Sequence, residues 1–173
     1  ILTVFIAGLM VGRTPEFLGK KIEPTEMRWA VVLCLATPFA ILVSSTIACM
    51  VPGLVDQLNN GGAHGFSEVL YTLTSAGGNN GSSFADMNCN IPWINVLLGI
   101  EMLFARFLPI AGTLAIAGSL AGKGKVAEGA GTLSTTNAMF VFLLVFVVLL
   151  IGALSFFPAL ALGPVAEFFQ MVA

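Results

Sequence analysis

The sequence has very little charge. Of its 173 residues only 9% are charged and 57% are hydrophobic, whereas an ordinary soluble domain carries nearer a quarter charged residues. The mean hydropathy is +0.97. This shortage of charge excludes a soluble globular protein and indicates a protein of the lipid bilayer.

Metal-binding cysteines and nucleotide-binding motifs are also missing. Cys34, Cys49 and Cys89 are widely spaced and form no C-x-x-C pair, so neither a zinc site nor a disulfide framework is indicated, and we expect thiols that only pack. The stretch "AIAGSLAGKGK" is not a phosphate-binding loop, because Ala117 stands where the motif needs Gly and Gly124 stands where it needs Ser or Thr.

The first residues, "ILTVFIAGLMVGRTP", have no initiating Met, no basic leader and no A-x-A cleavage site. They therefore do not have the pattern of a signal peptide. We expect a fragment that lacks the N-terminal part of a longer protein.

Long apolar runs are what the sequence does contain. A spanning helix needs about 20 mostly apolar residues, and residues 29–50, 93–119 and 139–160 qualify. Residues 1–12 have the composition of the end of a preceding span. The predicted fold class is an all-α polytopic membrane protein.

The basic residues predict how this protein is oriented. Lys and Arg occur in the segments 13–28 and 120–138, but residues 51–92 and the tail 161–173 contain none. Cytoplasmic loops carry the excess of Lys and Arg in membrane proteins. Both basic loops are therefore predicted to be cytoplasmic, with residues 51–92 and the C-terminus extracytoplasmic.

The outward segment between the first two spans contains a short apolar helix and a polar loop. "FSEVLYTLT", within a predicted helix over 65–74, is too short to cross a bilayer but suits a re-entrant half-helix. It is followed at once by "SAGGNNGSSF". Irregular backbone at membrane depth persists only where protein buries it or where it lines a water-filled cavity. Residues 29–119 therefore match a span, pore-helix, filter and span repeat.

The polar loop has the composition of a cation-selective filter. Backbone carbonyls of an extended, Gly-containing loop can replace the water shell of a dehydrated potassium ion, and the C-terminal end of the half-helix directs a partial negative charge toward it. The predicted filter is the segment 74–81, which consists of Thr74, Ser75, Ala76, Gly77, Gly78, Asn79, Asn80 and Gly81. The same composition is also typical of a flexible extracytoplasmic linker.

Four stretches together resemble a known family. "FIAGLMVGRTPEFLGKKIEPTEMRWA", "HGFSEVLYTLTSAGGNNGSSF", "IAGSLAGKGK" and "GALSFFPALALGPVAEFF" resemble, in collinear order, the C-terminal third of the potassium-binding A subunit of the bacterial Kdp-type potassium-transporting P-type ATPase. The likeness covers essentially the whole chain. One Gly/Asn-rich loop would be weak evidence, but the ordered set is specific.

The resemblance implies a potassium-channel-like fold in one chain, with four pore-loop repeats and an extra helix at each end. Residues 1–12 would end the third repeat, 29–119 would form the fourth, and 139–160 would be the extra C-terminal transmembrane helix. Gly81 matches the glycine of an N-N-G motif that the family carries. Gly78 departs from the family, which usually has Asn there, so a carbonyl role is expected at this position and a side-chain role is in doubt.

The resemblance also implies partners and a location. The remaining repeats of the full-length chain would complete the filter, and a catalytic P-type ATPase subunit with small accessory subunits would form the complex. The transported potassium ion is the one expected ligand, and no nucleic-acid partner is expected. The location implied is the bacterial plasma (inner) membrane.

Arg106 is a charge in the middle of an apolar span. Such a placement costs roughly 2.5 to 3.5 kcal/mol on insertion scales, and residues of this kind usually face a cavity or a carboxylate. The resemblance places an Arg near the internal ion path, and the alternative is a partner on another helix that serves assembly. Glu101 is about 140° away around the helix, so the two need not meet.

The remaining charged residues of the outward segment suggest less. Asp56, Glu68 and Asp86 are expected on the outward face, where acidic groups can concentrate cations, although solvated surface charge is the commoner explanation. His64 is expected to be a cap or an interfacial residue.

The predicted function is potassium-selective binding and translocation within an ATP-driven, high-affinity uptake complex. The chain lacks the D-K-T-G aspartate of a phosphorylated ATPase subunit, so it is predicted to be a non-catalytic subunit. A passive pore-loop potassium channel or transporter subunit without an ATPase partner is the first alternative. A membrane-anchoring assembly protein whose outward loop is only a linker is the second.

Overall fold

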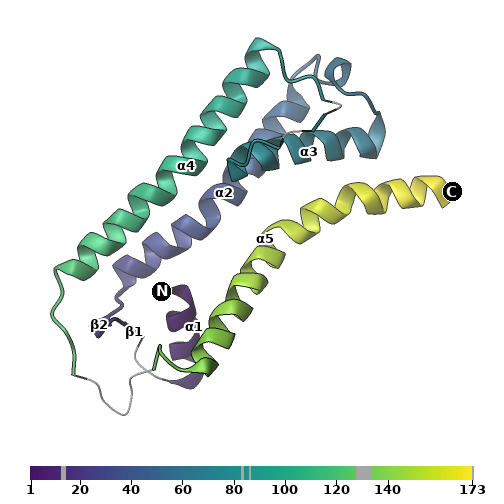
Figure 1. The fold of residues 1–173 in the computed structure, drawn as a ribbon. Coiled ribbons are helices and arrows are strands. Elements are labelled where there is room, and N and C mark those ends of the chain that lie inside the picture. Colours follow the sequence, from purple (N-terminus) through teal and green to yellow (C-terminus); the bar gives the residue numbers. More distant parts are fainter. Residues whose placement is uncertain (13–14, 83, 86, 128–133, 173) are drawn as a thin grey trace. The chain divides into compact units, whose positions relative to one another are not determined.

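The computed structural model describes residues 1–12, 15–82, 84–85, 87–127 and 134–172, without the side chains of residues 9–11, 155–160, 162 and 163. Helices dominate it (Figure 1). The elements are α1 (Leu2–Val11), β1 (Glu16–Phe17), β2 (Lys20–Lys21), α2 (Pro24–Met50), the 3-10 helix η1 (Val55–Gln57), α3 (Gly62–Gly78), α4 (Pro92–Ala121) and α5 (Ala138–Val172).

Two of the described helices, α2 and α4, are long and apolar enough to cross a membrane. Each begins with a proline, Pro24 or Pro92, whose fixed φ and missing N–H suit the first helical position. The predicted spans 29–50 and 93–119 lie inside them. The described apolar part of α5 is Ala138–Leu154.

The basic segment 13–28 contains a small hairpin where the sequence predicted only a loop. Glu16 pairs with Lys21 and Phe17 with Lys20 in antiparallel register. Leu18 and Gly19 both have positive φ, 54° and 70°, which is the backbone of a two-residue type I′ turn. Arg13 lies outside the described residues.

The C-terminal part of the chain also differs from the prediction. The sequence predicted a span at 139–160 followed by a tail at 161–173, but α5 continues as a helix to Val172. The physical reason is that helix-forming Ala, Leu, Glu and Gln residues continue past residue 160.

The described chain divides into two compact units. The first comprises Ile1–Cys34 and Ile110–Ala153. Two small apolar clusters hold it together, one around Val4, Ile22 and Met27 and the other around Ala30, Ile116 and Leu120.

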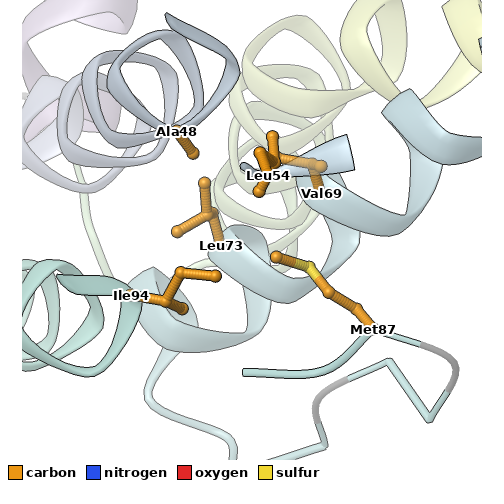
Figure 2. Packing of buried hydrophobic residues seen from close by; sticks show 6 residues of the cluster. All are labelled: Ala48, Leu54, Val69, Leu73, Met87 and Ile94. Carbon is orange, nitrogen blue, oxygen red and sulfur yellow. The ribbon is translucent and has the colours of Figure 1, made fainter. Parts of the chain in front are cut away.

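The second unit comprises Leu35–Pro109 and Leu154–Ala173 and contains all of α3. Its core joins α3 to the end of α2 and the start of α4. Figure 2 shows how the side chains of this core converge from different elements. They are Ala48, Leu54, Val69, Leu73, Met87 and Ile94.

A cluster of charged groups ties the two basic segments of the first unit together. Glu26 is 0% exposed and accepts hydrogen bonds from Lys123 Nζ at 2.8 Å and from Ser119 Oγ. Its other contact is the backbone N–H of Glu23, at 2.8 Å, where the N-terminus of α2 needs an acceptor. Lys20 Nζ donates to Leu120 O at 2.6 Å, at the carbonyl end of α4.

Lys123 provides the positive charge that a buried carboxylate requires. Partial desolvation opposes its charge, but the hydrogen bonds to Glu26 and Glu23 outweigh that effect and raise its pKa above the ordinary lysine value. A raised pKa means that the stabilisation is fully present below the unfolded lysine pKa and is lost as the pH rises through the folded pKa. The ion pair between Lys123 and Glu26 is therefore intact at neutral pH.

Replacing Lys123 tests this link. We expect Lys123→Met to lower the thermal midpoint of the full-length protein by a few degrees, because Glu26 keeps its charge without a cation. Adding Glu26→Gln to the same protein should recover part of the loss. The matched control is Lys125→Met, since Lys125 is exposed. Equal midpoints for the two single variants would contradict the link.

Candidate functional site

The polar loop begins at the C-terminal end of α3, which is longer than the sequence predicted. The half-helix expected at 65–74 instead covers Gly62–Gly78. Asn79 ends it with a left-handed backbone, φ 52° and ψ 36°, and its N–H bonds back to Ala76 O. Asn is, after Gly, the residue that most readily ends a helix in this way.

The predicted filter residues consequently fall into two groups. The backbone of Thr74–Gly78 is helical, which corrects the expectation of an extended strand from residue 74 onward. The physical reason is that the N–H groups of Asn79 and Asn80 donate to Ala76 O and Ser75 O and so close the last turn of the helix. Asn79–Gly81 leave the helix, and Asn80 and Gly81 are exposed.

Asn80 holds the loop in its turn. Its Oδ1 accepts hydrogen bonds from Ser75 Oγ at 2.7 Å and from the Ser82 N–H at 2.9 Å. The Ser82 hydroxyl in turn lies 3.1 Å from Tyr71 Oη. The Asn80 side-chain oxygen is therefore used within the loop.

Asn79 connects the loop to α4. Its Nδ2 donates to Met102 O at 3.3 Å and to Gly77 O at 3.4 Å. The turn after α3 is thus fastened to the middle of the following helix.

Gly77 lies close to both α2 and α4. A β-carbon at this position would lie 2.5 Å from Ile41 Cγ1 of α2 and 3.0 Å from Glu101 Oε1 of α4. The first distance is closer than side chains allow, so the packing requires glycine. The backbone here is helical, and the requirement is therefore one of space and not of φ.

Glu101 is buried beside this contact. It is 2% exposed, and neither carboxylate oxygen has a hydrogen-bond partner of good geometry among the described residues. Ser44 of α2, also buried, is near enough to interact with the carboxyl. The sequence suggested Glu101 only as a candidate partner for Arg106, because its position beside Gly77 depends on tertiary packing.

Arg106 lies on a different side of α4. It is exposed, and within the described part of the chain no ion pair joins it to Glu101 or to another carboxylate. The sequence argument that the two residues need not meet agrees with this arrangement.

The structure bears on two expectations about residues 51–92. Solvated surface charge was the commoner explanation for Glu68, but its side chain is 0% exposed. It accepts hydrogen bonds from the Asn59 N–H and from Asn60 Nδ2, which close the loop before α3. Asp86 lies outside the described residues. His64 Nδ1 lies 3.0 Å from Glu167 Oε1. His64 therefore pairs with the C-terminal part of α5.

Apolar side chains remain exposed along both long helices. On α2 they recur at Leu35, Phe39 and Leu42, and on α4 at Val96, Ile100, Leu103 and Phe107. These spacings place each set on one helix face, and such stripes suit lipid or further helices. Two long apolar helices with exposed apolar faces, joined through a short helix and a polar loop, define the class: a helical membrane protein.

Comparison with known proteins gives the family. The sequence pattern of the family described as "Potassium-transporting ATPase A subunit" matches residues 1–169. The chain therefore belongs to this family.

Relatives from several bacteria carry the name "Potassium-transporting ATPase potassium-binding subunit". The chain is 71% identical to that of Clostridium botulinum (strain Alaska E43 / Type E3) over 172 residues, which is 99% of this chain and 30% of the relative. Identity is 65% over 171 residues with Desulfovibrio desulfuricans, covering 99% of this chain and 29% of the relative. It is 54% over 169 residues with Listeria monocytogenes serotype 4a, covering 98% and 30%. The chain spans about three tenths of the length of these relatives.

Adjacent glycines at the end of α3 allow a matched test of the packing. We expect Gly77→Ala to lower the thermal midpoint, because the added methyl group overlaps Ile41 and overpacking typically costs about 1–3 kcal/mol. In Gly78→Ala the methyl group would meet Asn80 Nδ2 at 3.4 Å, an ordinary contact. That variant should be as stable as the parent or more so, since Ala favours helix over Gly. Similar midpoints for both would show that the three helices do not meet as described.

Proposed function

We propose that this chain is the C-terminal part of a potassium-selective binding and translocation subunit that works in an ATP-driven, high-affinity uptake complex. The observation that carries the proposal is family membership over residues 1–169 together with a polar loop set at the end of a short helix between two apolar ones. The names of the relatives describe a potassium-binding subunit of a potassium-transporting ATPase.

The loop after α3 is the proposed ion site, within the predicted filter Thr74–Gly81. Asn79 to Gly81 leave the helix, and Gly81 has φ +72°, a conformation that L-residues rarely adopt. Such backbone can turn successive carbonyls toward one axis, where they replace the hydration shell of potassium. The last carbonyls of α3 contribute the partial negative charge of a helix C-terminus.

In this proposal α2, α3, the loop and α4 form one pore-loop repeat. The remaining repeats of the full-length chain supply the other walls of the filter. α5 is the extra C-terminal transmembrane helix, and the exposed apolar stripes of α2 and α4 face lipid or those repeats.

Arg106 is proposed to lie on the ion path. An exposed guanidinium in the middle of a spanning helix is costly in lipid, and the described residues give it no counterion. A polar cavity within the complete subunit would accommodate it. There its charge shapes the field that the ion meets after the filter.

The protein is proposed to reside in the bacterial plasma membrane with both basic segments on the cytoplasmic side. The partners are a catalytic P-type ATPase subunit and small accessory subunits of the same complex. This subunit itself is proposed to bind and pass the ion without covalent chemistry. The alternative, a passive pore-loop channel or transporter subunit, predicts potassium uptake that does not depend on ATP hydrolysis by a co-purifying partner.

The filter is tested at Gly81 in the full-length subunit with its partners. We expect Gly81→Ser to raise the potassium concentration for half-maximal ATPase activity and to change the ratio of the potassium and rubidium values, because the carbonyl positions shift. Sodium is measured beside them as the excluded ion.

The control is Gly53→Ser in the same outward segment. Gly53 also has positive φ, +89°, and no atom within 4 Å of an added β-carbon. It carries a comparable backbone strain outside the loop, so its ion response should equal that of the parent. A normal response in an assembled Gly81→Ser complex would instead identify the loop as a linker.

A further inference from the structure

The buried carboxyl of Glu101 has no assigned role. Its side chain is 2% exposed, so the repeat itself encloses it between α2, the end of α3 and α4. Both oxygens are without a hydrogen-bond partner of good geometry among the described residues. An ionised carboxylate that is buried in this way requires a countercharge.

Among the described residues, no ion pair joins a basic side chain to Glu101. Residues 29–105 contain no Lys or Arg, and His64 pairs with Glu167. Arg106 is exposed and about 140° away around the helix.

The end of α3, which lies beside Glu101, adds more negative charge. Gly77 lies one residue before the end of α3, and a β-carbon placed on it would be 3.0 Å from Glu101 Oε1. The C-terminal end of a helix carries about half a negative charge. Carboxyl and helix end therefore reinforce each other, and both favour a cation at the loop that follows.

The loop is held next to this negative region. Asn79 Nδ2 donates to Met102 O at 3.3 Å, so the first residue of the loop is fastened to the residue that follows Glu101. A cation coordinated by Asn79–Gly81 would lie just beyond the C-terminus of α3, and the Glu101 carboxyl lies on the helix side of that terminus.

We propose that the Glu101 carboxylate determines the affinity of this subunit for cations, acting from behind the loop and taking the bound ion as its countercharge. This inference rests on the proposed function, because it assumes that the loop binds the transported ion. The carboxylate does not coordinate the ion. Its Coulomb attraction acts on any monovalent cation at the site, so it strengthens binding without selecting among ions.

The experiment uses Glu101→Gln in the full-length subunit, assembled with its partners. Glutamine has nearly the same shape but no charge. We expect the half-maximal concentrations of potassium and of rubidium for ATPase activity to rise by a common factor of about ten or more, with their ratio unchanged. The concentrations at which each ion stabilises the purified complex against heat should rise by the same factor.

The matched control is Glu68→Gln. Glu68 is as fully buried as Glu101 and lies in the same unit, but it is hydrogen-bonded and about 13 Å farther along α3 from Gly77. This variant is expected to lower the thermal midpoint while leaving both half-maximal concentrations close to those of the parent.

Two results would overturn the inference. Unchanged half-maximal concentrations in Glu101→Gln would mean that the carboxyl is neutral in the native protein or that the site does not sense it. A changed potassium to rubidium ratio would mean that Glu101 shapes the loop sterically. If the Gln variant does not assemble, Glu101→Asp is measured in its place. We then expect the half-maximal concentrations of both ions to rise by a smaller common factor. Unchanged concentrations, or a changed potassium to rubidium ratio, would again contradict the inference.

The Gly81→Ser variant separates this inference from the proposed function. If Gly81→Ser changes the potassium to rubidium ratio while Glu101→Gln responds to both ions as the parent does, the filter assignment stands and the role of Glu101 is rejected. A normal response in both variants would reject the filter itself.

Discussion

The close approach of three helices at Gly77 is the constraint on which the rest of the site depends. With no side chain at this position, α3 can end against Ile41 of α2 and Glu101 of α4. The end of α3 fixes where the helical carbonyls point and where Asn79 turns the chain away. Asn79 bonds the loop to Met102 of α4, and Asn80 bonds it to Ser75 and Ser82.

Buried carboxylates have different surroundings in the two units. The first unit neutralises its buried carboxylate, because Glu26 meets Lys123 at 2.8 Å. The second unit leaves Glu101 without such a partner, beside a helix terminus of the same sign. Buried charge in the first unit links two basic segments, whereas in the second it favours a positive ion. The two carboxylates thus differ in function because their surroundings differ, although both lie in apolar helices.

The sequence predicted several features because they depend on composition and local pattern. Apolar runs placed α2 and α4, and the family was identifiable from four ordered stretches of residues. The extent of α3 was predicted poorly. Its end at Gly78 depends on the left-handed backbone of Asn79 and on hydrogen bonds that close the last turn, and a run of Gly and Asn is equally compatible with an extended strand. Glu68 was expected at the surface because the donors that satisfy its buried carboxylate, the Asn59 N–H and Asn60 Nδ2, come from a loop whose fold the sequence does not specify.

By itself the sequence determined that this is a helical membrane protein of the potassium-transporting ATPase A subunit family, since hydropathy and ordered motifs are properties of the chain alone. Only the tertiary structure decided which glycine is required for packing and which carboxyl is buried without a partner. Gly77 and Glu101 are 24 positions apart in sequence, and nothing in either local pattern brings them together. Their contact arises because the short helix α3 packs between α2 and α4, and long-range packing of this kind depends on shape, which one-dimensional periodicity does not encode.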